Sequence, residues 1–324
     1  MCADLLKVTD LTIEYAPKNR PSKTAIEKLS FAVPSSGYTL GVVGESGSGK
    51  TTLGLGIMDL IEPPGRTVTG SVEFMGRNIL SMSPAELRRY RWQEVSMVFQ
   101  SAMNSLNPVK TVSNHIAEVI TEHSDATKSE AKEKSIRLLS DVGINRQRVN
   151  DYAHEFSGGM RQRVVIAMAL ALSPKLLIAD EPTSALDVVV QEQILGLIKE
   201  KVSEYGLSLL FITHEISILD GLVDNVAVMF AGEIVEMSTI DNVVFEPLHP
   251  YTEMLIDSLL TVGSNSGKLS KAMIPTEGLR SPIAAVGCKY SNRCKYAFDR
   301  CKNERPLLKE AEFGRWVACH KYNK

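Results

Sequence analysis

Short apolar runs alternate with longer amphipathic stretches along most of the chain, and this alternation is the first indication of its fold. Apolar or β-branched runs predict strands at residues 6–15, 25–33, 38–43, 68–74, 95–99, 176–179 and 207–213. Helices are predicted at residues 51–60, from Ser83 onward, and at 189–204 and 215–222. Residues 226–230 and 233–237 predict a hairpin. Strands that alternate with helices favour an α/β fold, in which helices cover a mostly parallel sheet.

Two stretches depart from this alternation. Residues 111–150 are polar, free of proline and helical in composition, which predicts a small helical subdomain inserted into the α/β core. Beyond Phe245 the periodicity weakens, and residues 261–282 are typical of a loop or linker.

Length and charge narrow the function classes. A chain of 324 residues predicts about two domains. The net charge of −2 argues against a nucleic-acid-binding surface over the whole molecule. The longest apolar run, residues 164–172, is far shorter than the ~20 residues that span a bilayer. No secretion signal is visible at the N-terminus, so we expect any action at a membrane to be peripheral.

One motif follows the apolar run at residues 38–43 and fits the phosphate-loop pattern G-x-x-x-x-G-K-[ST]. Its residues are Gly44, Glu45, Ser46, Gly47, Ser48, Gly49, Lys50 and Thr51, with Thr52 after them. Backbone N–H groups and the following helix would bind phosphate, Lys50 would reach the β- and γ-phosphates, and Thr51 would bind Mg²⁺. A plain Gly/Ser-rich turn is disfavoured, because a strand and a helix flank the motif. The motif predicts binding of a nucleoside triphosphate.

Two further groups carry candidate chemistry. Asp180 ends a buried strand and would hold Mg²⁺, and Glu181 after it would act as general base on the attacking water. Ser157, Gly158 and Gly159 precede a long apolar helix, whose N-terminus favours an anion. Taken alone, this second group could be a plain helix N-cap.

Residues 156–163, Phe-Ser-Gly-Gly-Met-Arg-Gln-Arg, resemble the signature motif of ABC-transporter ATPases, with Phe156 and Met160 in place of the common Leu and Gln. The other motifs of that family follow in order. They are the adenine-stacking Tyr15, the Q-loop Gln100, the Walker B pair Asp180 and Glu181, the D-loop of Ser184 to Asp187, and the switch His214.

The resemblance implies a P-loop NTPase of the ABC type in residues 1–245. Such a domain has a RecA-like core, an N-terminal antiparallel β subdomain and an inserted helical subdomain, here at about residues 101–160. It also implies a head-to-tail dimer of nucleotide domains, in which Ser157, Gly158 and Gly159 serve the partner's nucleotide. The D-loop residue Asp187 is a further candidate for binding nucleotide. His214 would contact the γ-phosphate, and Gln100 would join Thr51 and Asp180 around Mg²⁺.

Residues 246–324 form a small cysteine-rich extension. Its His249-Pro250-Tyr251-Thr252 run and its C-x₅-C-x₆-C-x₁₇-C spacing resemble the extension of peptide/oligopeptide-type importer ATPases. The four cysteines are Cys288, Cys294, Cys301 and Cys319. They lack the paired C-x₂₋₄-C spacing of zinc ribbons, and the resemblance implies a [4Fe–4S] cluster. Zinc and free or transiently oxidised thiols remain alternatives, and Cys2 is predicted to be a spectator.

The resemblance thus implies an ATPase subunit that powers a multi-subunit importer of di- or oligopeptides. Expected partners are a second ABC ATPase, two membrane-spanning permeases and an extracellular or periplasmic binding protein, with the chain at the cytoplasmic face of the membrane. Oligosaccharides or nickel are alternative cargoes. A soluble ABC ATPase acting on DNA or ribosomes is disfavoured by the single nucleotide domain and by the short stretch between Gln100 and Ser157. A redox-sensing regulator is disfavoured by the intact catalytic set.

Overall fold

The computed structural model describes residues 4–18, 21–34, 36–100, 105–260, 284 and 286–322. Cys2 and the linker expected at residues 261–282 lie outside these ranges. The chain divides into two compact units. The first comprises Met1–Pro34, Thr39–Leu80 and Ile212–Lys324, and the second comprises Ser35–Tyr38 and Ser81–Phe211.

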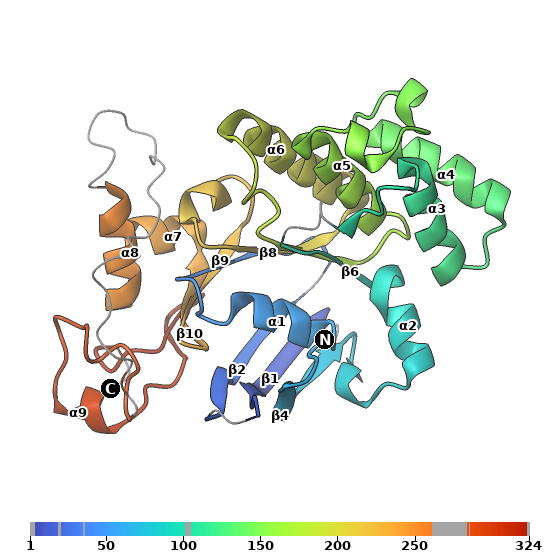
Figure 1. Ribbon diagram of the computed structural model, residues 1–324. Coiled ribbons are helices and arrows are strands. Elements are labelled where there is room, and N and C mark those ends of the chain that lie inside the picture. The colour runs from blue at the N-terminus through green and yellow to red at the C-terminus, as the bar shows by residue number, and fades with distance from the viewer. Residues whose placement is uncertain are drawn as a thin grey trace. The chain divides into compact units, whose positions relative to one another are not determined.

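An antiparallel sheet in the first unit confirms the expected N-terminal β subdomain. Its strand order is β2-β1-β4-β5. The strands are β1 (Leu6–Tyr15), β2 (Lys23–Val33), β4 (Gly65–Phe74) and β5 (Arg77–Asn78). Figure 1 shows β1, β2 and β4 side by side near α1 (Lys50–Ile57). The helix approaches closely because Gly56 has no side chain: a Cβ there would lie 2.7 Å from Cδ1 of Ile13, which is fully buried.

A second group of strands in this unit has the order β11-β12-β10-β9-β3. The strands are β3 (Thr39–Val43), β9 (Asn225–Phe230), β10 (Glu233–Thr239), β11 (Lys309–Glu312) and β12 (Arg315–Val317). β3 is buried throughout and runs parallel to β9, which agrees with the general burial of parallel strands. β10 turns back antiparallel to β9, which confirms the expected hairpin. β12 then pairs with β10, so the C-terminal extension adds strands to this sheet.

The remaining elements of the first unit are short. They are the helices α7 (Ile240–Phe245), α8 (Pro250–Leu260) and α9 (Asp299–Asn303) and the 3₁₀ turn η5 (Ile216–Leu219). The helix expected at residues 215–222 is therefore wrong, since only this four-residue turn forms there. Asp220 after it has extended backbone angles, and Gly221 takes a positive φ of 65°, so the chain cannot continue as a helix.

The second unit holds the strand order β8-β7-β6 and most of the long helices. Its strands are β6 (Val95–Val98), β7 (Leu176–Asp180) and β8 (Ser208–Thr213), whose last two residues belong to the first unit. Its helices are α2 (Pro84–Gln93), α3 (Val112–His123), α4 (Lys128–Asp141), α5 (Gly158–Ala169) and α6 (Val188–Tyr205), with 3₁₀ turns η3 (Arg146–Arg148) and η4 (Ala153–Glu155). The 3₁₀ turn η1 (Ile79–Ser81) lies at the boundary with the first unit.

Local sequence explains these helices. Capping boxes at Ser83 and Thr127 start α2 and α4: each hydroxyl accepts the N–H of the glutamate three residues later, and that glutamate accepts the cap's own N–H. Gly206, with a positive φ of 61°, ends α6. Together α3 and α4 confirm the helical character predicted for residues 111–150.

Candidate functional site

The phosphate-loop motif forms a tight turn between β3 and α1. Gly47 and Gly49 take positive φ values of 81° and 106°, which L-residues rarely adopt. The side chain of Lys50 is only 5% exposed, and its Nζ donates to the carbonyl oxygens of Gly44 at 2.8 Å and Glu45 at 2.9 Å. The ammonium group thus lies inside the loop, where a bound phosphate would be cradled.

Neighbouring backbone holds this loop tightly. A Cβ on Gly44 would lie 2.1 Å from the Met229 carbonyl oxygen, and one on Gly49 would lie 2.5 Å from the Ala25 oxygen. Gly232, in the turn between β9 and β10, donates its N–H to the Ser48 carbonyl at 2.8 Å. The Ser48 hydroxyl is buried and has no hydrogen-bond partner among the described residues, which suits an additional donor to phosphate.

Five more predicted site residues of this unit lie at or near the ends of elements. Tyr15 ends β1 and is half-buried, with its ring over Gly65: a Cβ there would lie 2.8 Å from Tyr15 Cε1. Thr51 and Thr52 are in the first turn of α1, and Ser46 is exposed at the tip of the loop. His214 follows β8 and is half-buried.

The second unit brings Gln100 and Glu181 together. Gln100 Nε2 donates to Glu181 Oε2 at 2.8 Å, although the two residues are 81 positions apart. Asp180 ends the wholly buried strand β7 and is 1% exposed. Glu181 has a positive φ of 45°, and such strain in a residue with a side chain is common at functional sites. A carboxylate that accepts a hydrogen bond from a neighbouring amide is well placed to orient a water molecule and accept its proton.

The signature residues form the N-terminus of α5. The Ser157 side chain accepts the Met160 N–H at 3.4 Å, and Gly158 and Gly159 begin the helix. A Cβ on Gly159 would lie 2.4 Å from Cγ1 of Val190 in the first turn of α6. Asp187 caps α6 by accepting the N–H groups of Val189 and Val190 at 3.1 and 3.0 Å. The signature segment therefore packs against the first turn of α6, which the D-loop residue Asp187 caps.

The four C-terminal cysteines all line one cavity of about 20 Å³. They are Cys288, Cys294, Cys301 and Cys319, and none forms a disulfide. Burial raises the pKa of the Cys288 thiol to about 11, and the other three thiols add to the shift. Among the described residues, no three His, Cys, Asp or Glu side chains stand in an arrangement that could hold a metal ion. The sequence therefore brings the thiols together, but their positions here do not form a metal site.

Comparisons with known proteins identify the family. Residues 26–184 match the family described as ABC transporter, and residues 235–301 match "Oligopeptide/dipeptide transporter, C-terminal region". The oligopeptide transport ATP-binding protein AppD of Bacillus subtilis is 41% identical over 323 residues, which cover 98% of this chain and 97% of AppD. The chain belongs to the ABC transporter ATP-binding proteins. The dipeptide transport ATP-binding protein DppD of Escherichia coli is similar too, at 39% identity over 98% of this chain and 96% of DppD.

Solved structures of ABC cassettes share the fold. A dimeric ATP-binding cassette in a post-hydrolysis state, bound to ADP and Pi, superposes with a TM-score of 0.64 at 26% identity and covers 72% of this chain and 98% of its own. The expected ABC cassette fold is thus confirmed, and the chain is an ABC-type ATPase. No helix within the described ranges combines the length and apolarity needed to cross a bilayer.

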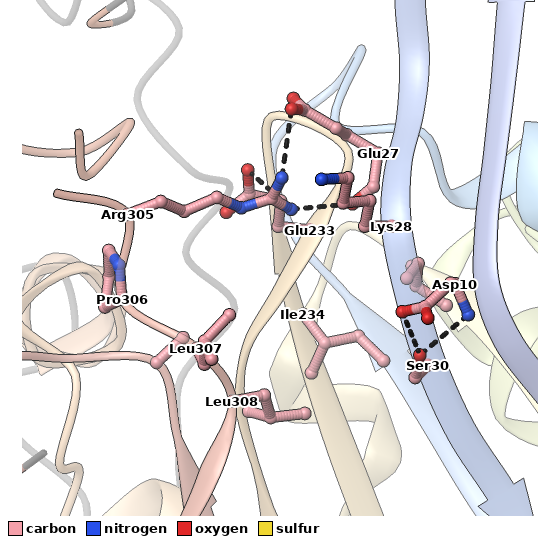
Figure 2. A pocket seen from close by; sticks show the side chains of 12 residues that line it. Asp10, Glu27, Lys28, Ser30, Glu233, Ile234, Arg305, Pro306, Leu307 and Leu308 are labelled. Atoms are coloured by element: carbon pink, nitrogen blue, oxygen red, sulfur yellow. Dashed lines mark hydrogen bonds and ion pairs between the residues drawn. The ribbon is translucent and has the colours of Figure 1, made fainter. Parts of the chain in front are cut away.

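The sequence gives no sign of a network of ion pairs that joins the extension of this ABC ATPase to β2 and β10 within the first unit. Arg305 contacts Glu27 at 2.9 Å and Glu233 at 3.1 Å, and Lys289 contacts the same two carboxylates at 2.6 and 2.9 Å. Burial raises the pKa of Glu233, and the two cations oppose that shift. Figure 2 shows Arg305, Glu27 and Glu233 at the rim of a cavity of about 470 Å³, with Asp10 and Ser30 opposite. No local pattern could have revealed partners that lie 278 residues apart.

Proposed function

We propose that this ABC ATPase is the subunit that hydrolyses ATP to power import of di- or oligopeptides through a multi-subunit transporter. The main support is that relatives named for oligopeptide and dipeptide transport align with nearly the whole chain, including the C-terminal region. In this proposal residues 1–245 carry the ATPase chemistry, and residues 246–324 form the transporter-specific extension.

The roles we assign rest on the motifs, on residue chemistry and on the geometry within each unit. Lys50 and the loop amides neutralise the β- and γ-phosphates. The hydroxyl, amide and carboxylate of Thr51, Gln100 and Asp180 are the oxygen donors that Mg²⁺ prefers, and the ion would neutralise charge on the phosphate oxygens. Glu181, held by Gln100, orients the attacking water and accepts its proton.

Substitution of the base tests this assignment. Glu181→Gln should keep the hydrogen bond from Gln100, because the new amide oxygen can still accept it. ATP binding should persist while hydrolysis falls by roughly 10²–10⁴-fold, the usual worth of a general base. Glu192→Gln, an exposed carboxylate on α6, is the matched control and should hydrolyse ATP at the wild-type rate. Near-normal phosphate release from Glu181→Gln would refute the role of Glu181.

We further propose a head-to-tail pair with a paralogous ATPase subunit. Val188 and Val189 next to Asp187 are 50% and 64% exposed, and such apolar exposure beside the D-loop suits a partner surface. Ser157→Arg should then impair hydrolysis at the partner's nucleotide rather than at the mutant chain's own. Full ATPase activity from a monomer, independent of concentration, would rule this pairing out. The remaining partners are two permeases and a substrate-binding protein, with the ATPase at the cytoplasmic face.

For the cysteines we propose a [4Fe–4S] cluster with a structural role. Four thiols on one cavity match such a cluster in donor type and number, although the side chains would have to reorient. The cluster would cross-link a segment too small to bury a core of its own. Protein purified without oxygen should carry roughly four irons and absorb near ~400 nm, and Cys294→Ser should lose both. One zinc and no iron would overturn the cluster and leave the structural role.

A further inference from the structure

Two residues of the extension contact Glu45, the second residue of the phosphate loop. The backbone N–H of Glu45 donates to the Tyr251 hydroxyl at 3.0 Å, and Arg293 Nη1 lies 3.3 Å from the Glu45 carboxylate. The side chains of Arg293 and Glu45 are only 14% and 22% exposed, so solvent screens this ion pair less than a surface pair. Glu45 is thus held by both its backbone and its side chain.

Tyr251 is fixed in place by the packing around it. Its ring is fully buried against Phe230, with the ring centroids 4.6 Å apart. Its backbone N–H donates to Nδ1 of His249 at 3.0 Å, which satisfies the start of α8. The Glu236 carboxylate in turn accepts the His249 N–H at 2.8 Å. These contacts of the His-Pro-Tyr run fix the position of the Tyr251 hydroxyl, which accepts the Glu45 N–H.

Arg293 is held just as firmly. Its guanidinium lies over the Phe230 ring, 5.5 Å from the centroid, which is a cation–π contact. It precedes Cys294 directly, so it belongs to the segment between the first two cysteines of the extension. Phe230 thus supports both Tyr251 and Arg293 from the end of β9.

Glu45 also shapes the part of the loop that binds phosphate. Its carbonyl accepts Nζ of Lys50 at 2.9 Å and the N–H of Ser48 at 3.1 Å. A phosphate loop binds tightly when its donors are aimed before the ligand arrives, because no ordering remains to be done on binding. Contacts that hold Glu45 in place therefore also help to position the Lys50 ammonium group and the turn from Glu45 to Ser48.

We propose that Tyr251 and Arg293 are positioning residues that clamp Glu45 and so set the nucleotide affinity of the loop. The inference rests on the proposed ATPase function and adds to it a role for the extension that involves no contact with nucleotide. The clamp acts on binding rather than on the chemical step, so its loss raises the dissociation constant and KM for MgATP and leaves kcat nearly unchanged.

The test uses the full-length chain and the variants Tyr251→Phe and Arg293→Gln. Each removes one contact worth a single hydrogen bond or a part-buried ion pair, so each should weaken MgATP binding roughly 3–10-fold with kcat changed less than twofold. Tyr290→Phe is the matched control, since it removes a hydroxyl from the same aromatic cluster. Arg293→Lys should recover part of the affinity. In a cycle with Glu45→Gln, the double variant should bind no more weakly than Arg293→Gln alone.

Hydrogen exchange supplies a second measurement, independent of turnover. The loop amides of Tyr251→Phe should exchange faster than those of Tyr290→Phe. Dissociation constants within twofold of wild type, or equal exchange in the two tyrosine variants, would overturn the clamp alone. Failure of the wild-type chain to bind MgATP, with Lys50→Ala behaving identically, would instead overturn the proposed function together with the clamp.

Discussion

Gly44 and Gly47 lie three residues apart in one loop, and the structure requires glycine at each for a different reason. Gly44 has an ordinary backbone conformation, but a Cβ there would lie 2.1 Å from the Met229 carbonyl oxygen. Gly47 has a positive φ of 81°, and a Cβ there would meet nothing within 4 Å. Alanine at Gly44 therefore tests close approach alone, and alanine at Gly47 tests backbone strain alone.

The two costs can be estimated separately. Alanine in the left-handed region costs about 1–2 kcal/mol. Alanine also lowers the conformational entropy of the unfolded chain, which offsets about 0.4–1 kcal/mol of that cost. Gly47→Ala should therefore lower the free energy of unfolding by about 1 kcal/mol. At Gly44 the obstacle is a backbone oxygen of β9, which pairs with both β3 and β10 and cannot swing aside as a side chain could. We expect about 3 kcal/mol or more for Gly44→Ala.

Thermal unfolding distinguishes the two variants. For a domain of this size, about 1 kcal/mol lowers the melting temperature by roughly 2–4 °C. Gly47→Ala should therefore melt ~2–4 °C below wild type and Gly44→Ala ~6–12 °C below it. Gly44→Ala should also lose the stabilisation that MgATP gives, because the loop must shift away from β9. If both variants melt within 2 °C of each other, the close packing of Gly44 on Met229 is refuted.

Two further predictions concern packing and pH. Gly159→Ala should lower the melting temperature because its Cβ would lie 2.4 Å from Cγ1 of Val190; Val190→Ala in the same chain should restore part of the loss, and additive losses would contradict the contact. Burial lowers the pKa of His249 to about 3. Between pH 6.5 and 3 the imidazole is therefore protonated in the unfolded chain and neutral in the folded chain. As the pH falls through this range, the free energy of unfolding should decrease by about 1.4 kcal/mol per pH unit. His249→Asn keeps a cap acceptor that does not titrate, so the wild-type advantage in melting temperature should shrink from pH 7.5 to 5; a constant difference would contradict it.

Local patterns predicted the elements whose causes are local. The strand before the phosphate loop, the cap at Ser83 and the hairpin after residue 225 depend on neighbours within a few positions, and all three are present. The turn at residues 216–219 was expected to be a longer helix, because periodicity alone does not register the left-handed backbone of Gly221. The apolar spacing there is typical of a helix, but the backbone angles of Asp220 and Gly221 end the turn after Leu219.

Contacts between distant segments could not be predicted in this way. The motifs identify both Gln100 and Glu181 as candidate site residues, but they do not predict the hydrogen bond between them. The His-Pro-Tyr-Thr run is a recognisable motif, yet nothing near Tyr251 in sequence shows that its hydroxyl contacts a residue 206 positions earlier. Composition and spacing identify which side chains matter, and only packing shows which of them meet.

The boundary expected at residues 245 and 246 illustrates the same limit. It is placed where the hydrophobic periodicity is lost, but the turn between β9 and β10 contacts both the extension and the phosphate loop. Lys289 donates to the Ala231 carbonyl at 2.8 Å, and the next residue, Gly232, donates to Ser48 within the loop. The extension therefore supports the loop in two separate ways, through this turn and through the contacts of Tyr251 and Arg293 with Glu45. These contacts end on the Ser48 carbonyl and on the backbone and carboxylate of Glu45, all within the loop and none on the nucleotide. The extension can therefore change how well the loop is ordered without taking part in hydrolysis.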